Sequence, residues 1–228
     1  MSNFNKFAKN YDNSLNEILN SKVNIDSEYF AEYKIKEVYS QLKYLIKPKK
    51  ILDFGCGIGK NSIYLSKYFN ESEIYGIDVS SDSIEIANAR NLNNCHFEVY
   101  DGENIKFENN LFDLIFISNV FHHIEHKKHL KILKKLKKKL SKNGFIFMFE
   151  HNALNPVTLN IVNECEFDKD AKLLHYWYAK KIFADAGFKN IYLNFIFFIP
   201  PSLSKLLFLE NYLKWLPLGG QYYIFGTK

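Results

Sequence analysis

Residues 51–61 read ILDFGCGIGKN and decide the fold, because an apolar strand pattern runs directly into three alternate glycines and then into a helical pattern. Glycine allows a tight turn and the close approach of a ligand to the backbone, and the start of the following helix offers free N–H groups. The spacing is GxGxG and not the GxGxxG of a dinucleotide fold, since Lys60 stands where the last glycine would be. The loop therefore predicts a ligand site and disfavours a pyrophosphate ligand.

Outward from this loop, short apolar runs alternate with stretches of helical period, which is the pattern of a parallel sheet with crossover helices. Ser80 or Ser81 is expected to cap the second helix, and Asn143-Gly144 to stop the third. The strands are expected at 50–54, 73–77, 95–99, 112–117 and 145–149, and the helices at 60–69, 81–89 and 125–140.

The alternation loosens after residue 150, and residues 152–175 have no clear period. A helix over 176–186, closed by Gly187, precedes a strand over 191–199. A helix-like stretch at 203–216 separates that strand from a last strand at 222–225, so the two strands are expected to form an antiparallel edge pair with a helical insertion.

Composition and charge bound the classes of function. The chain has 228 residues, of which 47% are apolar and 17% aromatic, which is enough for a packed core. Its net charge of +5 arises from nine lysines in residues 127–142, and the rest of the chain is acidic. Leucines at 130, 133, 136 and 140 form an apolar stripe there, so the lysines are expected to be solvated and no nucleic-acid partner is expected. Three cysteines without a CxxC pair fit a reduced, cytoplasmic setting.

Acidic residues follow the next strands. Asp78 ends the second strand, where a carboxylate can accept hydrogen bonds from both ribose hydroxyls of an adenosine. Together LDFGCGIG, GIDVS, YDGENIKF and FDLIFISNVFHHI occupy residues 51–124 in an order and spacing that resemble the class I S-adenosylmethionine-dependent methyltransferases. A dinucleotide or flavin binder that carries GxGxG is the alternative.

The resemblance implies a cofactor site for S-adenosylmethionine and its product S-adenosylhomocysteine. Its residues are Asp53, Gly55, Gly57 and Gly59 for the methionine part, Asp78 for the ribose, Val79 for the adenine face, Asp101 with Gly102 for the adenine amino group, and Ser118 and Asn119 beneath the sulfonium. Asp101-Gly102 is also a strong turn dipeptide, so a purely structural role for Asp101 stays open.

The family resemblance also implies the fold class, an α/β, three-layer Rossmann-like methyltransferase fold with a central, mostly parallel seven-strand sheet, an antiparallel C-terminal strand and a helical insertion. Residues 1–228 are expected to form a single domain, with residues 1–30 as an N-terminal lid and 196–220 as an insertion over the active-site edge. Residues 4–12 resemble the FxxxAxxYD opening of small-molecule methyltransferases, which would place Tyr11 near the methyl group or anchor it in the core.

Catalysis of methyl transfer needs a base only where the acceptor arrives protonated, and histidine is the side chain best matched to neutral pH. Residues 150–158 resemble an EHNPxNPxT segment of a bacterial subgroup associated with surface-polysaccharide genes, with Ala153 in place of a proline. We expect Tyr11, His122, Glu150 and His151 to surround the methyl group. Glu150 and His151 could instead only end the strand, and His123 could fix its loop through a structural hydrogen bond.

No metal is expected, since methyl transfer requires none and since His126 and His129, the possible partners of His122, lie among lysines on what should be the wet face. The DPPY tetrapeptide that grips a nucleobase or amide is absent, so a small-molecule acceptor is expected, a sugar or nucleotide-linked glycan precursor methylated on oxygen. The alternatives are an N-methyltransferase of a small amine and a non-catalytic cofactor-binding module. The apolar run at 191–199 is too short to span a bilayer, and the aromatic insertion fits an acceptor cap or a homodimer interface equally well.

Overall fold

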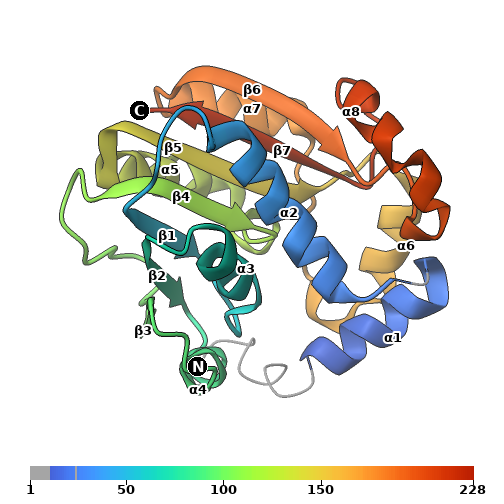
Figure 1. Cartoon of the computed structure of the whole chain (residues 1–228), viewed down its shortest axis with the longest axis horizontal. Coiled ribbons are helices and arrows are strands. Elements are labelled where there is room, and N and C mark those ends of the chain that lie inside the picture. The colour runs from blue at the N-terminus through green and yellow to red at the C-terminus, as the bar shows by residue number, and fades with distance from the viewer. Residues whose placement is uncertain (1–10, 24) are drawn as a thin grey trace.

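A central sheet of seven strands organises the computed structural model, which describes residues 11–23 and 25–228 apart from the side chains of residues 11–13 (Figure 1). The strand order is β3-β2-β1-β4-β5-β7-β6, and β7 runs antiparallel to both of its neighbours. The strands are β1 (Lys50–Phe54), β2 (Glu73–Asp78), β3 (Cys95–Val99), β4 (Phe112–Ser118), β5 (Leu140–His151), β6 (Lys189–Ile196) and β7 (Gln221–Thr227). The predicted sheet, with its antiparallel C-terminal pair, is confirmed.

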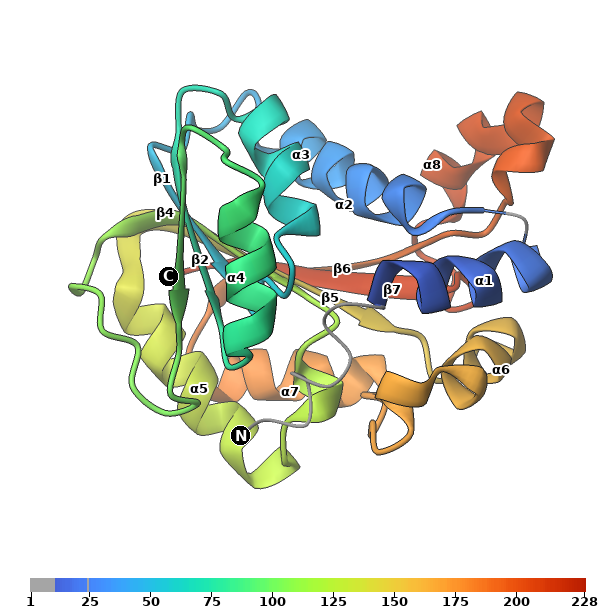
Figure 2. The same cartoon turned by 90° about the horizontal axis from the view of Figure 1, so that it is seen from below.

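The central strands are apolar on both faces because helices cover both. Ile51 packs on one face with Leu65 of α3 (Lys60–Tyr68) and Val38 of α2 (Ser27–Leu42). Leu52 packs on the other face with Leu133 of α5 (His126–Lys139), beside α7 (Tyr176–Asp185). Figure 2 shows these two helical layers above and below the sheet. Such two-sided burial is typical of parallel strands and leaves only the strand ends open to a ligand.

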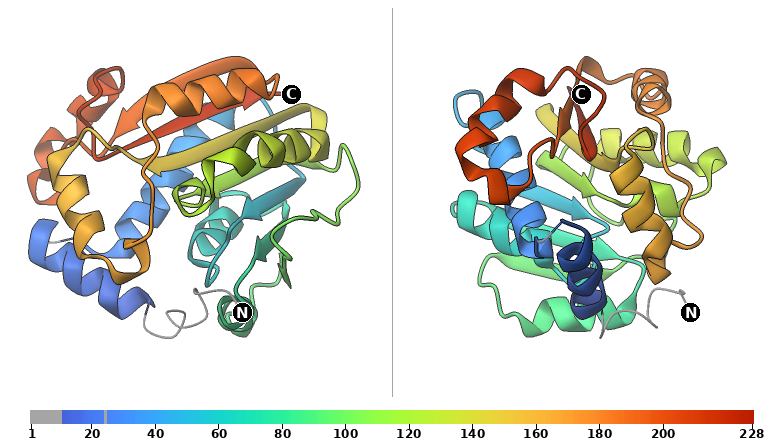
Figure 3. Two further views of the ribbon diagram at one scale, coloured as in Figure 1. Left: turned by 180° about the vertical axis from the view of Figure 1, so that it is seen from behind. Right: turned by 90° about the vertical axis from the view of Figure 1, so that its right-hand side faces the viewer.

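Helices α1 (Tyr11–Val23), α2 and α6 (Pro156–Glu164) cover the edge of the sheet at which the parallel strands end, as Figures 1 and 3 show. Lys22 of α1 and Glu164 of α6 form an ion pair of 2.6 Å. Residues 1–10, including most of the predicted opening motif, lie outside the described residues. Helix α4 (Ser81–Ala89) flanks β2 and β3, and its cap is Ser80, whose hydroxyl accepts from the Ser83 N–H.

The connection from β6 to β7 contains the 3₁₀ segment η4 (Pro201–Leu209) and the short helix α8 (Glu210–Leu213). Buried Glu210 fixes it, because its carboxylate accepts from the N–H groups of Phe198 (2.9 Å) and Ile199 (3.0 Å) and from the Tyr33 hydroxyl of α2 (2.7 Å). The predicted helix-like stretch at 203–216 is therefore mostly 3₁₀. The predicted strand over 191–199 ends at Ile196, since Phe197 has φ +64° and the next N–H groups turn to Glu210.

Two further boundaries differ from the sequence prediction. Helix α5 ends at Lys139 and β5 begins at Leu140, not after Asn143-Gly144, because Leu140 pairs with Phe112 across a register shift in β4. Residues 152–175, which show no period, contain α6 and the 3₁₀ turn η3 (Glu166–Asp168). None of the helices in the described part of the chain is both long and apolar enough to cross a membrane.

Candidate active site

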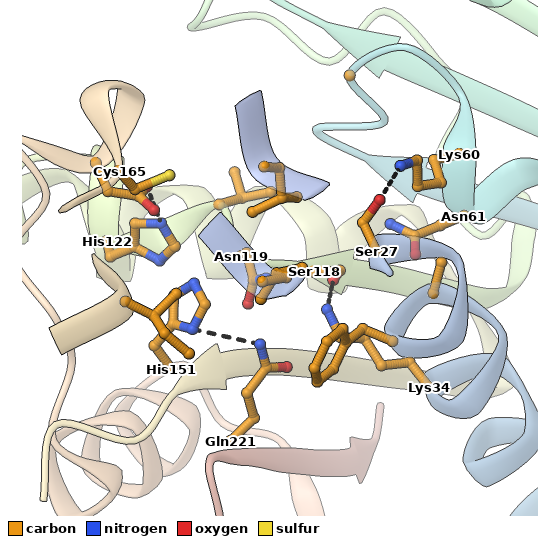
Figure 4. A pocket seen from close by; sticks show the side chains of 18 of the residues that line it. Ser27, Lys34, Lys60, Asn61, Ser118, Asn119, His122, His151, Cys165 and Gln221 are labelled. Atoms are coloured by element: carbon orange, nitrogen blue, oxygen red, sulfur yellow. Dashed lines mark hydrogen bonds and ion pairs between the residues drawn. The ribbon is translucent and has the colours of Figure 1, made fainter. Parts of the chain in front are cut away.

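A cavity of about 1000 Å³ lies at the carboxyl ends of β1, β2, β4 and β5. It is lined by the glycine loop on one side and by residues of α1, α2, α6 and the β6–β7 connection on the others, among them Leu15, Leu19, Phe197 and Pro200. Figure 4 shows the polar end, where Lys34, Ser118, Asn119, His122, His151 and Gln221 converge from different elements. Side chains that are distant in sequence therefore share one site.

The glycine loop leaves space that only a ligand would fill. Gly55, Gly57 and Gly59 have φ values of +75°, +51° and +76°, and Gly59 precedes the first turn of α3. A Cβ on Gly55 would lie 2.4 Å from Val120 Cγ2, whereas a Cβ on Gly57 would meet nothing within 4 Å. Gly57 lines the cavity, so the backbone is bare where it faces the open space.

Asp78 ends β2 at the cavity wall and holds the glycine loop. Its Oδ2 accepts from the Gly57 N–H at 2.9 Å and its Oδ1 from the Ser80 N–H at 2.9 Å. Burial raises the pKa of Asp78, while these backbone donors oppose the rise. Val79 and Gly102 line the cavity beside it. The acid and its neighbours therefore line one wall of the cavity, and their assignment to a ribose and an adenine stays a prediction.

Asp53 and Asp101 lie outside the cavity lining. Asp53 is buried behind the loop, where its Oδ2 accepts from the Ser62 hydroxyl at 2.7 Å; burial raises its pKa to about 7. Asp101 is exposed and accepts from the N–H groups of Glu103 (2.7 Å) and Asn104 (2.6 Å), which lower its pKa to about 2. The described contacts of Asp101 are those of a turn aspartate.

Orphaned polar atoms mark the cavity as a site for a polar ligand. Within the described residues, four buried side-chain oxygens have no hydrogen-bond partner, those of Asp53, Tyr100, Asn119 and Gln221. All but Asp53 line the cavity. A buried polar atom without a partner costs stability, so these atoms fit a ligand that carries several hydrogen-bonding groups, as an adenosine derivative does.

A buried chain of charged groups forms the far wall of the cavity. His122 Nδ1 lies 2.6 Å from Glu150 Oε2, and its Nε2 lies 3.5 Å from Asp168 Oδ1. Burial lowers the pKa of His122, but the two carboxylates more than offset this and raise it to about 9. The Phe121 N–H donates to Glu150 Oε1 at 2.8 Å. Both ring nitrogens of His122 thus face acids, and neither is free to take a proton from an acceptor.

His151 lines the same wall with its ring 5.2 Å from that of His122, centroid to centroid. Burial and the charge of His122 lower its pKa to about 4, so its imidazole is neutral at pH 7. Gln221 Nε2 lies 3.3 Å from its Nδ1, and rotation of this amide would bring the unpaired Oε1 to the same place. The Gln221 amide can therefore either donate to Nδ1 of His151 or accept from it, and so matches either tautomer of the ring.

The other predicted residues fall as follows. Tyr11 begins α1, but its side chain is outside the description. His129 was expected on the wet face and is instead fully buried, with Nε2 2.9 Å from the carbonyl oxygens of Phe121 and Ile124, so that prediction was wrong. It fixes the turn that presents His122 and His123.

Three site residues were missed. Lys34 reaches in from α2, a helix that the sequence analysis did not predict, and donates to Ser118 Oγ at 2.8 Å. Asp168 and Gln221 lie in segments to which the sequence analysis assigned no role in the site. Asp168 is the buried acid of the turn η3, which follows α6. Nothing in the local sequence indicates its contact with His122. That contact forms where the chain folds back and the Lys172 N–H donates to the His122 carbonyl.

A parallel sheet with a bare glycine loop after β1 and an acid after β2 defines a Rossmann-like protein for a nucleoside-containing ligand. Residues 51–144 match the family described as "Methyltransferase domain". This match covers 94 of the 228 residues, and together with the fold it supports a class I S-adenosylmethionine-dependent methyltransferase domain.

Curated relatives match a little over a third of the chain. The chain is 30% identical to an uncharacterized methyltransferase of Schizosaccharomyces pombe over 37% of its length and 34% of that protein. It is 35% identical to phosphoethanolamine N-methyltransferase 1 of Arabidopsis thaliana over 37% of its length and 18% of that protein. The match thus spans about a third or less of these relatives. A methyltransferase structure from Archaeoglobus fulgidus shares the fold, with a TM-score of 0.68 at 17% identity over 93% of this chain and 99% of that one.

Proposed function

We propose that the protein methylates a hydroxyl oxygen of a small polar acceptor, a sugar or glycan precursor. S-adenosylmethionine would supply the methyl group from its sulfonium. The observation that carries the proposal is half-buried His151 at the end of β5, inside the same cavity as the glycine loop, with a pKa lowered to about 4 so that its ring is neutral at pH 7. An alcohol loses a proton when it is methylated, and a neutral imidazole in a dry site is suited to receive it.

The cofactor end of the cavity would be held by the residues that line it. The bare backbone at Gly57 leaves room for the methionine part, and Asp78 has lone pairs left after its two backbone hydrogen bonds. Val79, Gly102, Ser118 and Asn119 line the remaining surface. The buried unpaired Asn119 Oδ1 and Tyr100 hydroxyl would then gain partners.

His122, Glu150 and Asp168 support His151 indirectly. The charge on His122 lowers the pKa of His151 and keeps that ring neutral before reaction. When the cationic cofactor gives up its methyl group, the imidazolium of His151 would replace the lost positive charge, with Glu150 nearby to stabilise it. The net charge of the site would thus stay constant. We assign Glu150 and His122 as positioning residues, and keep Tyr11 as a lid candidate.

The lid and the insertion would complete the site. Leu15 and Leu19 of α1 and residues 197–202 of the β6–β7 connection line the cavity and supply its apolar walls. Such walls exclude water, which strengthens the hydrogen bonds that align an acceptor. Removal of either segment should therefore affect the acceptor end more than the glycine loop.

Methylation of a small amine is the second candidate. It is favoured by the relative named phosphoethanolamine N-methyltransferase and by the buried carboxylates of Glu150 and Asp168, which would attract a cation. A third candidate, a cofactor-binding module without catalysis, predicts binding of S-adenosylmethionine without its consumption. Consumption during a screen of hydroxylated sugars, nucleotide sugars and small amines separates all three.

The decisive variant is His151→Gln, with exposed His96→Gln as the matched control. With the acceptor found in the screen, we expect kcat to fall about 10²- to 10⁴-fold while the affinity for S-adenosylhomocysteine stays nearly unchanged. The control should keep full kcat. Full activity of His151→Gln would mean that alignment alone suffices, and the acceptor would then be an already ionised oxygen such as a phosphate or carboxylate.

A further inference from the structure

Three side chains bring ligand atoms together at the acceptor end of the cavity. Asp168 Oδ1 lies 3.3 Å from His123 Nε2 and 3.5 Å from His122 Nε2, and the three atoms lie within 4.8 Å of one another. All three residues line the cavity. Two imidazoles and one carboxylate are the donor set of many catalytic zinc sites.

The environment of His122 suits a metal ligand. Its Nδ1 lies 2.6 Å from Glu150 Oε2, so an Nδ1–H is donated there. A metal ion would displace the proton that Nε2 carries in the metal-free protein, and the Nε2 lone pair would then be directed at the cluster. Glu150 is itself held by the Phe121 N–H. A carboxylate behind a ligating histidine, itself fixed by a backbone donor, is the usual outer arrangement around a protein-bound metal.

The spacing also fits. Bonds of about 2.0–2.1 Å in a tetrahedron separate neighbouring ligand atoms by about 3.3–3.4 Å, close to the two distances from Asp168. The segment that carries Asp168 is tied to the histidine loop, since the Lys172 N–H donates to the His122 carbonyl at 2.8 Å. With three protein ligands, a fourth position would open into the cavity.

We propose that His122, His123 and Asp168 bind one divalent metal ion of the zinc type at the acceptor end of the cavity, with Glu150 orienting His122. The proposal replaces the expectation of no metal, which considered His126 and His129 as partners of His122. In the folded chain Nε2 of His129 lies at hydrogen-bond distance from two backbone carbonyls, and His126 stacks on Tyr178. The proposed ligands beside His122 are therefore His123 and Asp168.

The metal would also have a role in the reaction, and this part rests on the proposed function. An acceptor hydroxyl at the open position would bind through oxygen, and the cation would lower its pKa. Two bonds would break: the O–H bond, whose proton would pass to His151, and the bond between the methyl carbon and the sulfonium sulfur, whose electron pair would stay on sulfur in S-adenosylhomocysteine. The new bond would join the acceptor oxygen to the methyl carbon. Metal binding itself requires neither cofactor nor acceptor.

The test is a titration of chelator-treated full-length protein with Zn²⁺ by calorimetry, and with Co²⁺ by visible absorption, in the absence of S-adenosylmethionine. We expect one ion per chain, a cobalt spectrum of low coordination number, and a rise in Tm with Zn²⁺. His123→Gln and Asp168→Asn should each lose the site, and Glu150→Gln should weaken it about 10- to 100-fold. His126→Ala, an exposed histidine on the same segment, is the control and should bind as the wild type does.

The outcomes separate cleanly. Absence of stoichiometric Zn²⁺ binding in the wild type, binding of Mg²⁺ in preference to Zn²⁺, or retention of the site in His123→Gln or Asp168→Asn would each overturn the proposal. Far-ultraviolet circular dichroism checks that each variant is folded, and half-buried His123 gives the variant least dependent on core packing. Since no methyl transfer is measured, failure of the metal site and failure of the proposed function give different results.

Discussion

Nζ of Lys34 lies 2.8 Å from Oγ of Ser118, and this contact joins helix α2 to the end of β4 inside the cavity. Lys34 is 4% exposed, and no carboxylate among the described residues lies within ion-pair distance of its Nζ. Burial lowers its pKa to about 7, with Glu150 opposing the shift. A buried amine without a carboxylate beside it lowers the free energy of unfolding, but it places a polar group in the cavity.

Replacement of Lys34 by Met should therefore stabilise the protein at low pH. Below about pH 7 the folded chain carries the full cost of a buried ammonium, and this cost declines as pH rises from 7 towards the unfolded pKa of about 10.4. We expect the free energy of unfolding of Lys34→Met to exceed that of the wild type by about 1–3 kcal/mol at pH 6. The difference should be smaller at pH 9. Urea unfolding at several pH values measures this.

Exposed Lys36 on the same helix provides the control. Lys36→Met should change the free energy of unfolding by less than about 0.5 kcal/mol at every pH. A Lys34→Met protein that is less stable than the wild type at pH 6 would show that the hydrogen bond to Ser118 outweighs the cost of burial.

Asp53 should show the opposite pH dependence. Its pKa is raised to about 7 by burial, so its ionised form costs stability; the cost is absent below about pH 4 and complete above pH 7. Asp53→Asn, which can still accept from Ser62, should be more stable than the wild type by about 1–2 kcal/mol at pH 8 and equal to it near pH 4. Thermal unfolding across this range tests the prediction.

Exposed Asp101 is the matched carboxylate. Its pKa is lowered to about 2, so its favourable contribution is complete above about pH 4 and is lost only in stronger acid. Asp101→Asn should therefore leave the slope of stability between pH 5 and 8 unchanged. If both variants show the same slope as the wild type, Asp53 is ionised in the folded chain without cost.

The sequence was sufficient for the sheet and for the place of the glycine loop and Asp78 at the ends of β1 and β2. Alternating apolar runs and the GxGxG loop are local signals, and Asp78 and Gly57 lie in them, so their contact across 2.9 Å follows from the strand order. Asp53 and Asp101 show where such reasoning weakens. Both were expected to contact the cofactor, but the side chain of Asp53 accepts from Ser62 and that of Asp101 from the backbone of Glu103 and Asn104.

The acceptor end depends on long-range contacts that no periodicity encodes. Asp168 reaches His122 only because residues 165–174 fold back onto the fourth-strand loop, and Lys34 enters only because α2 crosses the strand ends. His129 was misplaced because the lysines around it suggest a wet face, whereas its side chain points beneath the turn at 121–124. The residues that the sequence analysis failed to place were thus mainly polar residues buried by tertiary contacts.

Asp78 should be essential for cofactor affinity. Asp78→Asn removes a charged acceptor from the cavity wall while an amide oxygen remains for one of the two backbone donors. Hydrogen bonds to a charged group contribute about 1.5–3 kcal/mol, so the affinity for S-adenosylhomocysteine should fall about 10- to 100-fold in calorimetry. Unchanged affinity would remove Asp78 from the binding site, and NAD binding of similar strength would point to a different class of ligand.

The two loop glycines separate ligand contact from packing. Gly55 and Gly57 both have positive φ, so alanine at either position costs about 1–2 kcal/mol of backbone strain. At Gly55 the new methyl group would also meet Val120 at 2.4 Å, which should add about 1–3 kcal/mol, whereas at Gly57 it would enter open cavity.

Gly57→Ala should therefore fold with a small loss in Tm and lose cofactor affinity by at least about 10-fold, because the methyl group occupies ligand space. Gly55→Ala should lose more stability, so thermal unfolding without ligand and calorimetry with S-adenosylhomocysteine are measured on both. Wild-type affinity in a folded Gly57→Ala protein would mean that the ligand does not approach the backbone at this glycine.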